Sequence, residues 1–407
     1  MHIVLITHHY PPEVGAPQRR WQQFSRRFVA QGHRVTVLAP PPHYPQGDVE
    51  DLADEDRPRA TSRGQGGETI HRVRFRPHGP DLLSRTLDQA VAAGHSVWVG
   101  ARRLRRSDRP DVVIATAPGI PSLGAGYLLS RWFRVPLVVE MRDAWPDLIA
   151  PSGMWGHARR RGWKAWATRT AHRIVTSLQR RADAVVTTTA SFADILRGRR
   201  MPRVEVIRNG AATVEPLAPA AATRGTLHVL YLGTMGRSQG LVNAVYAAAY
   251  ATARGVPVRL RLVGGGHDEQ GLREAAAQLG IDVEFIGRVP PSEVEAHYAW
   301  ADTVLVSLRA WDPFEWTVPS KLYEVMASGR HVSAALAGEA AYVLLEAGAG
   351  DVVPPEDPEA LADLWVALAA DRSRLRVGQN GRRWVAEHAD FDRLAAHYLE
   401  VIGEVVR

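Results

Sequence analysis

The sequence of 407 residues contains no cysteine. Disulfide scaffolds, thiolate metal sites and cysteine nucleophiles are therefore excluded. No apolar run approaches the roughly 20 residues that a helix needs to span a bilayer. The first residues, Met1 to Ile6, lack the charged segment and the longer apolar segment of a signal peptide, which predicts a cytoplasmic protein.

What remains is an ordinary globular composition, with 45% hydrophobic and 23% charged residues. The length suits two domains of about 200 residues each. The net charge of +7 favours anionic partners, such as phosphorylated substrates, lipid head groups or nucleic acid. The alternative is a surface on which many arginines are simply solvated.

The first half alternates strands and helices. A β-branched run at 3–7 leads through a Gly/Pro loop into a helix with Trp21, Phe24 and Phe28 at helical spacing. Further strands are predicted at 35–38, 73–75, 112–115, 137–140, 184–187 and 204–207, and a long loop at 45–68. This βαβ pattern indicates a parallel sheet.

The second half repeats the pattern after a small, proline-containing linker at 211–225. Its strands are predicted at 227–232, 259–263, 283–286, 303–307 and 331–334. The expected fold is α/β, with two facing Rossmann-like doubly wound domains, residues 1–213 and 214–388, and a helix in 389–407 that packs back on the first domain. Open sheets bind ligands at the carboxyl ends of their strands, so we expect the chemistry in the cleft between the domains.

Three glycine-containing strand ends predict phosphate binding, because backbone amides at a strand-to-helix turn can approach an anion. The first is Gly15, within 11–17. The second is the loop 231–240, where glycines and one arginine form a diphosphate cradle, and the third is 262–266. Ordinary βα turns and a flexible loop are the alternatives.

A short helix predicted at 320–328 is the most informative motif. Pro319 and Ser320 open it and Gly329 ends it. Lys321 and Glu324 lie three apart and share one face, so one can hold a phosphate while the other accepts ribose hydroxyl protons. The alternative is a surface ion pair.

These motifs, in this order, resemble family 4 of the retaining glycosyltransferases, which have the GT-B fold. Within that family, the sequence is most similar to bacterial enzymes that transfer N-acetylated amino sugars in surface-polysaccharide assembly. The shared segments are His9-Tyr10-Pro11-Pro12-Glu13, Arg142-Asp143-Ala144-Trp145-Pro146, and Pro319-Ser320-Lys321 with Glu324. The resemblance implies a UDP-linked sugar donor, a glycan, lipid-linked or small-molecule hydroxyl acceptor, and neither a metal nor a cofactor.

The resemblance also implies site residues. Glu324 would bind the ribose, Arg237 and Lys321 the diphosphate, and Gly287-Arg288-Val289 the base. Donor-binding residues would be Gly15, Gly233, Gly236, Arg237, Gly240, Gly264, Gly287, Arg288, Val289, Glu315, Pro319, Ser320, Lys321 and Glu324. Asp143, Arg237 and Lys321 are the catalytic candidates, and His9, Glu13, Arg142 and Trp145 the acceptor-side candidates. The alternative for Arg142 and Asp143 is an ion pair with a purely structural role.

Three departures from the family pattern stand out. Trp316 occupies the place of the first glutamate of the family's E-x7-E motif, and Glu315 lies one residue earlier. Thr234 and Gln239 replace the usual basic residues of the phosphate loop, and Arg142 stands where many members have histidine. The implied mechanism needs no strong enzymic nucleophile, because the leaving diphosphate takes the acceptor proton.

Two basic clusters suit a membrane surface, where aromatic rings lie beside cations. One is a helix predicted at 159–182 with Trp163 and Trp166, and the other is the arginine-rich segment 102–106. The alternative is a solvated basic helix with its tryptophans in the core. Alternatives for the whole chain are a GT-B nucleotide-sugar 2-epimerase and a non-enzymatic basic nucleotide-binding protein.

Overall fold

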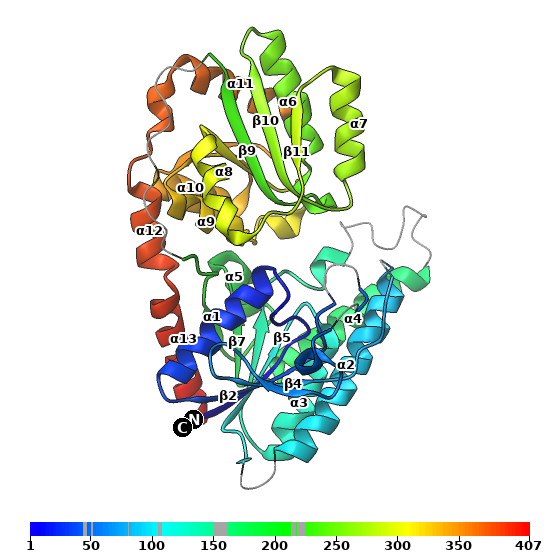
Figure 1. The fold of residues 1–407 in the computed structure, drawn as a ribbon. Coiled ribbons are helices and arrows are strands. Elements are labelled where there is room, and N and C mark those ends of the chain that lie inside the picture. The colour runs from blue at the N-terminus through cyan, green and yellow to red at the C-terminus, as the bar shows by residue number, and fades with distance from the viewer. Residues whose placement is uncertain are drawn as a thin grey trace. The chain divides into compact units, whose positions relative to one another are not determined.

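The computed structural model describes residues 1–43, 47–49, 52–79, 81–104, 108–149, 162–212, 217 and 225–407. The chain forms two compact units (Figure 1). Unit 1 contains Met1–Asn209 and Phe391–Arg407, and unit 2 contains Gly210–Asp390. The division falls a few residues from the predicted boundaries, and most of the predicted linker lies outside the described residues.

Unit 1 is built on an eight-stranded sheet of order β3-β4-β2-β1-β5-β6-β7-β8, parallel except for the β3–β4 pair. Its strands are β1 (His2–Ile6), β2 (Arg34–Ala39), β3 (Thr61–Arg63), β4 (Thr69–Arg72), β5 (Val112–Thr116), β6 (Leu137–Met141), β7 (Ala184–Thr187) and β8 (Val204–Val206). Strands β1, β5, β6 and β7 are buried along their whole length, as expected for parallel strands covered on both faces.

The helices of unit 1 are α1 (Ala16–Ala30), α2 (Leu82–Arg103), α3 (Ile120–Phe133), α4 (Gly162–Arg180), α5 (Ala190–Gly198) and α13 (Phe391–Val406), with 3₁₀ turns η1 (Asp54–Asp56) and η3 (Asp147–Ile149). Helix α1 buries Trp21, Phe24 and Phe28 on one face. The ring of Tyr398 on α13 lies 5.4 Å from that of Phe24. The C-terminal helix α13 therefore completes the core of unit 1.

The strand predicted at 73–75 is wrong. The strand in this region is β4, which ends at Arg72, and β3 lies inside the segment predicted as a loop. Arg72 is buried because its Nε donates to the carboxylate of Asp56 at 3.0 Å. Strand β4 alternates half-buried and buried residues and carries a buried arginine, so it gives no apolar run to recognise.

Unit 2 contains a six-stranded parallel sheet of order β11-β10-β9-β12-β13-β14. Its strands are β9 (Leu227–Thr234), β10 (Val258–Gly265), β11 (Val283–Ile286), β12 (Thr303–Ser307), β13 (His331–Ala335) and β14 (Gly350–Val353). Its helices are α6 (Val242–Ala253), α7 (Glu269–Leu279), α8 (Val294–Trp300), α9 (Ser320–Ser328), α10 (Gly338–Ala347), α11 (Pro358–Ala370) and α12 (Asn380–His388). Its 3₁₀ turns are η4 (Arg237–Gln239), η5 (Pro291–Glu293), η6 (Asp312–Phe314) and η7 (Arg372–Leu375).

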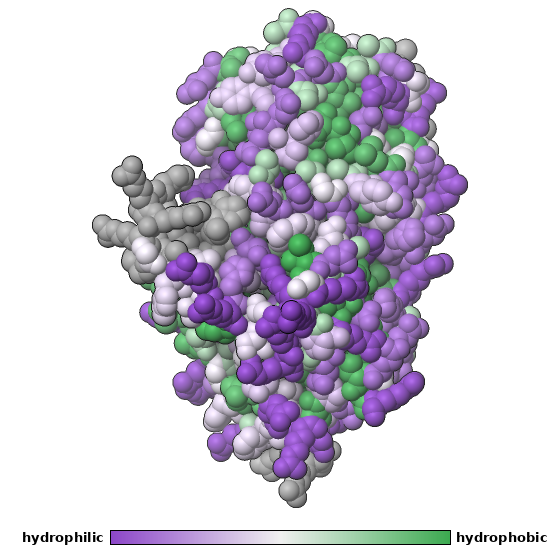
Figure 2. Space-filling view, turned by 180° about the vertical axis from the view of Figure 1, so that it is seen from behind, coloured by the Kyte–Doolittle hydropathy of each residue, from purple (hydrophilic) through white to green (hydrophobic). Residues whose placement is uncertain are grey.

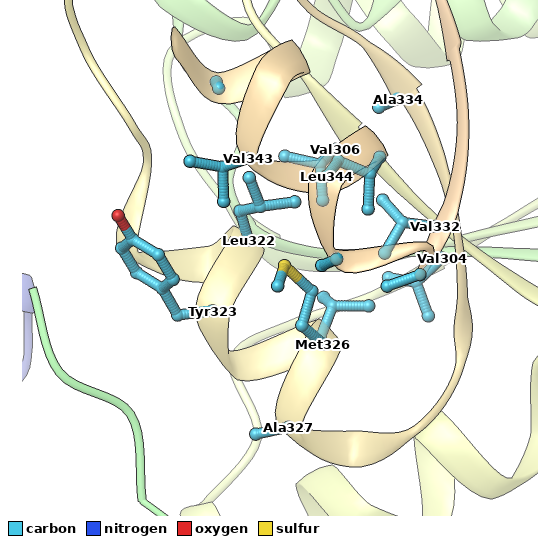
Figure 3. Close-up of a cluster of buried hydrophobic side chains, with 14 of the residues drawn as sticks. Val304, Val306, Leu322, Tyr323, Met326, Ala327, Val332, Ala334, Val343 and Leu344 are labelled. Carbon is cyan, nitrogen blue, oxygen red and sulfur yellow. The ribbon is translucent and has the colours of Figure 1, made fainter. Parts of the chain in front are cut away.

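Helix α9 is fixed to this sheet by its apolar face. Leu322 and Met326 are fully buried in a cluster that includes Val304, Val332 and Leu344 from β12, β13 and α10 (Figure 3). Burying each of these two side chains stabilises the unit by about 1.5–3 kcal/mol. The packing of one face determines where the polar face of this short helix lies.

Candidate active site

In unit 2, the predicted donor-binding residues follow adjacent strands of one sheet. Because β11, β10, β9, β12 and β13 are parallel neighbours, the loops that leave their carboxyl ends meet at one edge. Backbone hydrogen bonds join these loops: Met235 N donates to Gly265 O at 3.0 Å, and Arg309 N donates to Ser238 O at 2.9 Å. The fold thus gathers at this edge the loops that the sequence analysis treated as separate motifs.

Gly233 and Gly264 allow strands β9 and β10 to approach closely at this edge. Gly264 has φ +127°, and a Cβ on it would lie 2.0 Å from the carbonyl oxygen of Gly233. Gly264 N also donates to Gly287 O at 3.2 Å, which ties β10 to the segment after β11. A side chain at position 264 would force these backbones apart.

The loop that follows β9 carries the predicted phosphate cation. Gly236 caps η4, and Gly240 ends it in the left-handed region at φ 59°. The exposed Arg237 has one guanidinium nitrogen 2.9 Å from Nε2 of His267, so its side chain lies over the loop after β10.

Arg309, which the sequence analysis missed, holds this loop from β12. Its Nε donates to the carbonyl of Arg237 at 2.7 Å, and its Nη1 lies 3.1 Å from the carboxylate of Glu356. Ser307 at the end of β12 donates to Gln239 O at 2.7 Å. Its position in the sequence, two residues beyond a buried strand, could have marked Arg309 as a candidate residue of this edge.

At the start of α9, Lys321 Nζ lies 2.6 Å from Glu324 Oε2. Their side chains are 24% and 20% exposed, so the pair is accessible and neither fully solvated nor fully buried. Pro319 caps the helix, and Gly329 ends it with φ 76°. The i,i+3 ion pair considered in the sequence analysis is therefore present, on a helix whose amino end lies at the candidate edge.

The remaining donor-binding candidates also lie on loops at this edge. Gly287 and Arg288 are exposed, and the half-buried Val289 packs against the core of unit 2. Glu315 has an exposed side chain, and its carbonyl accepts a hydrogen bond from Glu339 N at 2.9 Å. Gly338 passes so close that a Cβ on it would lie 2.1 Å from Glu315 O.

In unit 1, His9, Glu13 and Gly15 follow the end of β1. His9 Nδ1 lies 3.2 Å from Glu13 Oε2, which also accepts from Gln18 at 2.7 Å. Gly15 is extended and precedes α1, where its carbonyl accepts from Arg19 N. Burial opposes ionisation of Glu13, but the hydrogen bond from His9 and the nearby His43 outweigh it and hold its pKa at about 2.

The segment after β6 contains Arg142, Asp143 and Trp145. The Arg142 side chain is buried, and one nitrogen lies 3.5 Å from a carboxylate oxygen of the partly exposed Asp143. Within the described residues, Nε and Nη1 of Arg142 have no hydrogen-bond partner. Trp145 is half-buried beside them in sequence. A buried guanidinium with unused donors can bind an anionic or hydroxylated ligand.

The same edge of unit 1 contains three residues that the sequence analysis missed: His8, His43 and Asp88. His8 Nε2 lies 2.9 Å from Asp88 Oδ2, and the rings of His8, His9 and His43 are in mutual contact. The adjacent His8-His9 pair at the end of a strand was an available signal.

Two family models match successive parts of the chain. One, described as a glycosyl transferase 4-like domain, matches residues 15–210, and the other, glycosyl transferases group 1, matches residues 226–371. Together they span both units and include the loops described above. The chain belongs to the family 4 glycosyltransferases, and its fold is GT-B.

Individual relatives agree with this assignment. The putative colanic acid biosynthesis glycosyl transferase WcaI of Escherichia coli is 26% identical over 344 residues, which cover 81% of this chain and 82% of WcaI. The sucrose-phosphate synthase of Thermosynechococcus elongatus has a TM-score of 0.77 at 19% identity, covering 99% of this chain and 98% of its own. HepE of Anabaena, solved with UDP-glucose, has a TM-score of 0.67 at 17% identity, covering 99% and 100%.

Proposed function

We propose that this glycosyltransferase moves a sugar from a UDP-linked donor to a hydroxyl acceptor with retention of anomeric configuration. The observation that carries the proposal is the Lys321–Glu324 pair at the start of α9, on the sheet edge that also holds the glycine loop and Arg237. The cation of Lys321 can bind a diphosphate, and the neighbouring carboxylate of Glu324 can accept hydrogen bonds from the ribose that is linked to it.

In this proposal, Glu324 accepts hydrogen bonds from the ribose hydroxyls, and Lys321 turns from Glu324 toward the diphosphate. Arg237 and the amides around Gly233, Gly236 and Gly240 bind the remaining phosphate oxygens. The segment Gly287-Arg288-Val289 contacts the base. The UDP-glucose complex of HepE supports UDP as the nucleotide.

The reaction depends on charge stabilisation at the leaving group. As the glycosidic bond to the diphosphate breaks, negative charge develops on the phosphate oxygens, where Arg237, Lys321 and the loop amides stabilise it. The leaving diphosphate accepts the proton of the attacking hydroxyl. In this proposal the cationic side chains and amides stabilise the negative charge of the diphosphate, so no metal ion is needed there. Asp143 contacts the reacting sugar or the acceptor hydroxyl.

Acceptor binding is assigned to unit 1, with His9, Glu13, Arg142 and Trp145 as its residues. The unused donors of buried Arg142 suit an acceptor that carries an anionic or hydroxyl group next to the attacked position. The name of the E. coli relative supports a role in polysaccharide assembly. The resemblance noted in the sequence supports an N-acetylated hexosamine as the transferred sugar.

The surface of unit 1 supports a peripheral membrane role in the cytoplasm. A hollow of about 490 Å³ is lined by Arg59, His95, Trp98, Arg102 and Arg103, among others. Trp166 on α4 is 63% exposed, so it does not pack into the core, whereas the side chain of Trp163 lies outside the described residues. Hydrophilic residues cover most of the face in Figure 2, with smaller hydrophobic patches among them.

Among the described residues, no helix combines the length and the apolar character that crossing a membrane requires. Co-sedimentation with anionic liposomes at low salt is the direct test of surface binding. Recovery of the protein in the supernatant would remove the membrane from the proposal.

The donor assignment is tested by calorimetry and turnover across nucleoside diphosphates and their sugars. We expect UDP to bind, and a UDP-linked N-acetylhexosamine to be consumed with formation of an α-linked product from an α-linked donor, seen by NMR. Inversion at the anomeric carbon would refute retention. Epimerised free nucleotide sugar, with no glycoside formed, would favour the epimerase alternative.

A further inference from the structure

A cluster of three histidines lies at the carboxyl edge of the unit 1 sheet, and only one of them, His9, is among the proposed acceptor-binding residues. His8 and His9 follow β1, and His43 follows β2, which pairs directly with β1. Their ring centroids lie 5.0, 4.9 and 5.3 Å apart. One ring nitrogen from each can be chosen so that all three lie within 4.8 Å of one another.

Each of these rings has one nitrogen directed at an oxygen acceptor. His8 Nε2 lies 2.9 Å from Asp88 Oδ2, His9 Nδ1 lies 3.2 Å from Glu13 Oε2, and His43 Nδ1 lies 2.8 Å from Pro41 O. Histidines that bind a metal through one nitrogen commonly donate the other N–H to a carboxylate or a carbonyl. His9 and His43 form such a second hydrogen bond, and His8 Nε2 lies within ion-pair distance of Asp88.

The contacts of these histidines determine which ring nitrogen carries the proton, and they leave buried nitrogen lone pairs on the other side of the ring. A carbonyl only accepts, so His43 carries its proton on Nδ1 and presents a lone pair on Nε2. Within the described residues, His43 Nε2 and His8 Nδ1 have no hydrogen-bond partner, although both side chains are more than nine-tenths buried. Such buried polar atoms are uncommon unless a ligand or an ion satisfies them.

The spacing of the rings matches a tetrahedral metal ion. With nitrogen ligands about 2.0–2.1 Å from zinc, the centroids of two bound imidazoles lie about 5 Å apart, which is the separation measured here. Their ligating nitrogens would be about 3.3 Å apart, and the chosen nitrogens of the three histidines lie within 4.8 Å of one another here, so metal binding would draw the rings closer together.

We propose that His8, His9 and His43 bind a divalent transition-metal ion, with Zn²⁺ as the ion that the site fits best. Three neutral imidazoles with a fourth position left open are a common ligand set for zinc. This site belongs to unit 1 and is independent of the diphosphate chemistry proposed for unit 2.

The direct test uses the full-length protein without an affinity tag. After chelation and dialysis, we expect calorimetry and elemental analysis to find about one zinc ion per chain, and Co²⁺ to give the visible spectrum of a tetrahedral complex. Zinc should also raise the melting temperature by mass action. Absence of zinc uptake, or an octahedral Co²⁺ spectrum, would overturn the proposal without reference to any variant.

Variants then locate the ion. His43→Gln should weaken zinc binding by at least about 100-fold, and Asp88→Asn, which acts through His8, by about 10- to 100-fold. His95→Gln, which changes a histidine of α2 outside the cluster, is the matched control and should bind zinc like the unaltered protein. Melting curves of the metal-free variants report folding, and the Co²⁺ spectrum remains decisive if one of them unfolds.

A second arrangement shares one ligand with the first: His43, His78 and Asp88 also bring three donor atoms within 4.8 Å. We therefore expect His8→Gln to lose zinc and His78→Gln to keep it. The reverse pattern would overturn the assignment to the three histidines. Binding that survives in His8→Gln, His9→Gln and His43→Gln alike would do the same.

Discussion

Replacing Glu324 by glutamine tests the donor site most directly, because it removes one charge and preserves the shape of α9. Two effects oppose each other. The carboxylate that would accept the ribose hydroxyls is lost, and Lys321, which lies 2.6 Å from that carboxylate, is released toward the diphosphate.

The magnitudes decide between these effects. Each hydrogen bond to a charged group contributes about 1.5–3 kcal/mol, so two ribose contacts amount to roughly 3–6 kcal/mol. The Lys321–Glu324 pair is about one-fifth exposed, and ion pairs of this kind contribute at most about 1 kcal/mol. The net loss of about 2–5 kcal/mol corresponds to a decrease in UDP affinity of about 30-fold to several thousand-fold.

Isothermal titration with UDP and with uridine separates ribose from phosphate recognition. Glu324→Gln should weaken both ligands, whereas Lys321→Ala should weaken UDP and leave uridine unchanged. Asp363→Asn, which removes the exposed ion pair between Arg254 and Asp363 in the same unit, is the control. If Glu324→Gln binds UDP within threefold of the unaltered protein, the assignment of Glu324 to the ribose is wrong.

Three further predictions follow. Arg237→Ala should lower UDP affinity about 10- to 100-fold through one lost charged contact, with uridine unaffected, and equal loss for both ligands would contradict a phosphate role. Gly264→Ala should lower the free energy of unfolding by about 2 kcal/mol or more, because of its positive φ and its contact with Gly233, whereas Gly271→Ala, in open space on α7, should be neutral or stabilising by up to about 1 kcal/mol in chemical denaturation. The pKa of Glu13 is lowered from 4.5 to about 2, so its carboxylate stabilises the folded protein above pH 4.5, and this stabilisation is lost as the pH falls toward 2. Glu13→Gln should therefore melt below the unaltered protein at pH 6, with the gap narrowing in acid, and a constant gap would refute this linkage.

The sequence predicted the sheet of unit 2 and the loops that leave it because buried parallel strands read as continuous apolar runs. Strand β12 is a clear example, since all of its residues are buried and a helix with its own start and stop signals follows. The edge strands β3 and β14 gave no such signal. Their residues are mostly exposed or half-buried, and pairing with a neighbour stabilises them more than their own composition does.

The loop around Arg237 shows a different limit. Its glycines and its single arginine were recognisable, but the residue that holds the loop in place, Arg309, follows β12, a direct neighbour of β9 in the sheet that is distant in the chain. Contacts of this kind depend on strand order. Strand β12 lies beside β9 in the sheet, although β10 and β11 come between them in the chain. A motif supplies the candidate ligands, and only the topology supplies the residues that orient them.

The histidine cluster of unit 1 marks the point where a closer reading of the sequence could have gone further. Consecutive strands of a βαβ unit commonly pair, so the ends of β1 and β2 were expected to be neighbours, and each is followed within a few residues by histidine. That reasoning would have placed His8 and His9 near His43. It would not have found Asp88, which comes from α2 and lies 2.9 Å from His8 Nε2. The family resemblance implied no metal, and the proposed site differs from it in resting on buried imidazoles, which are ligands that zinc commonly binds.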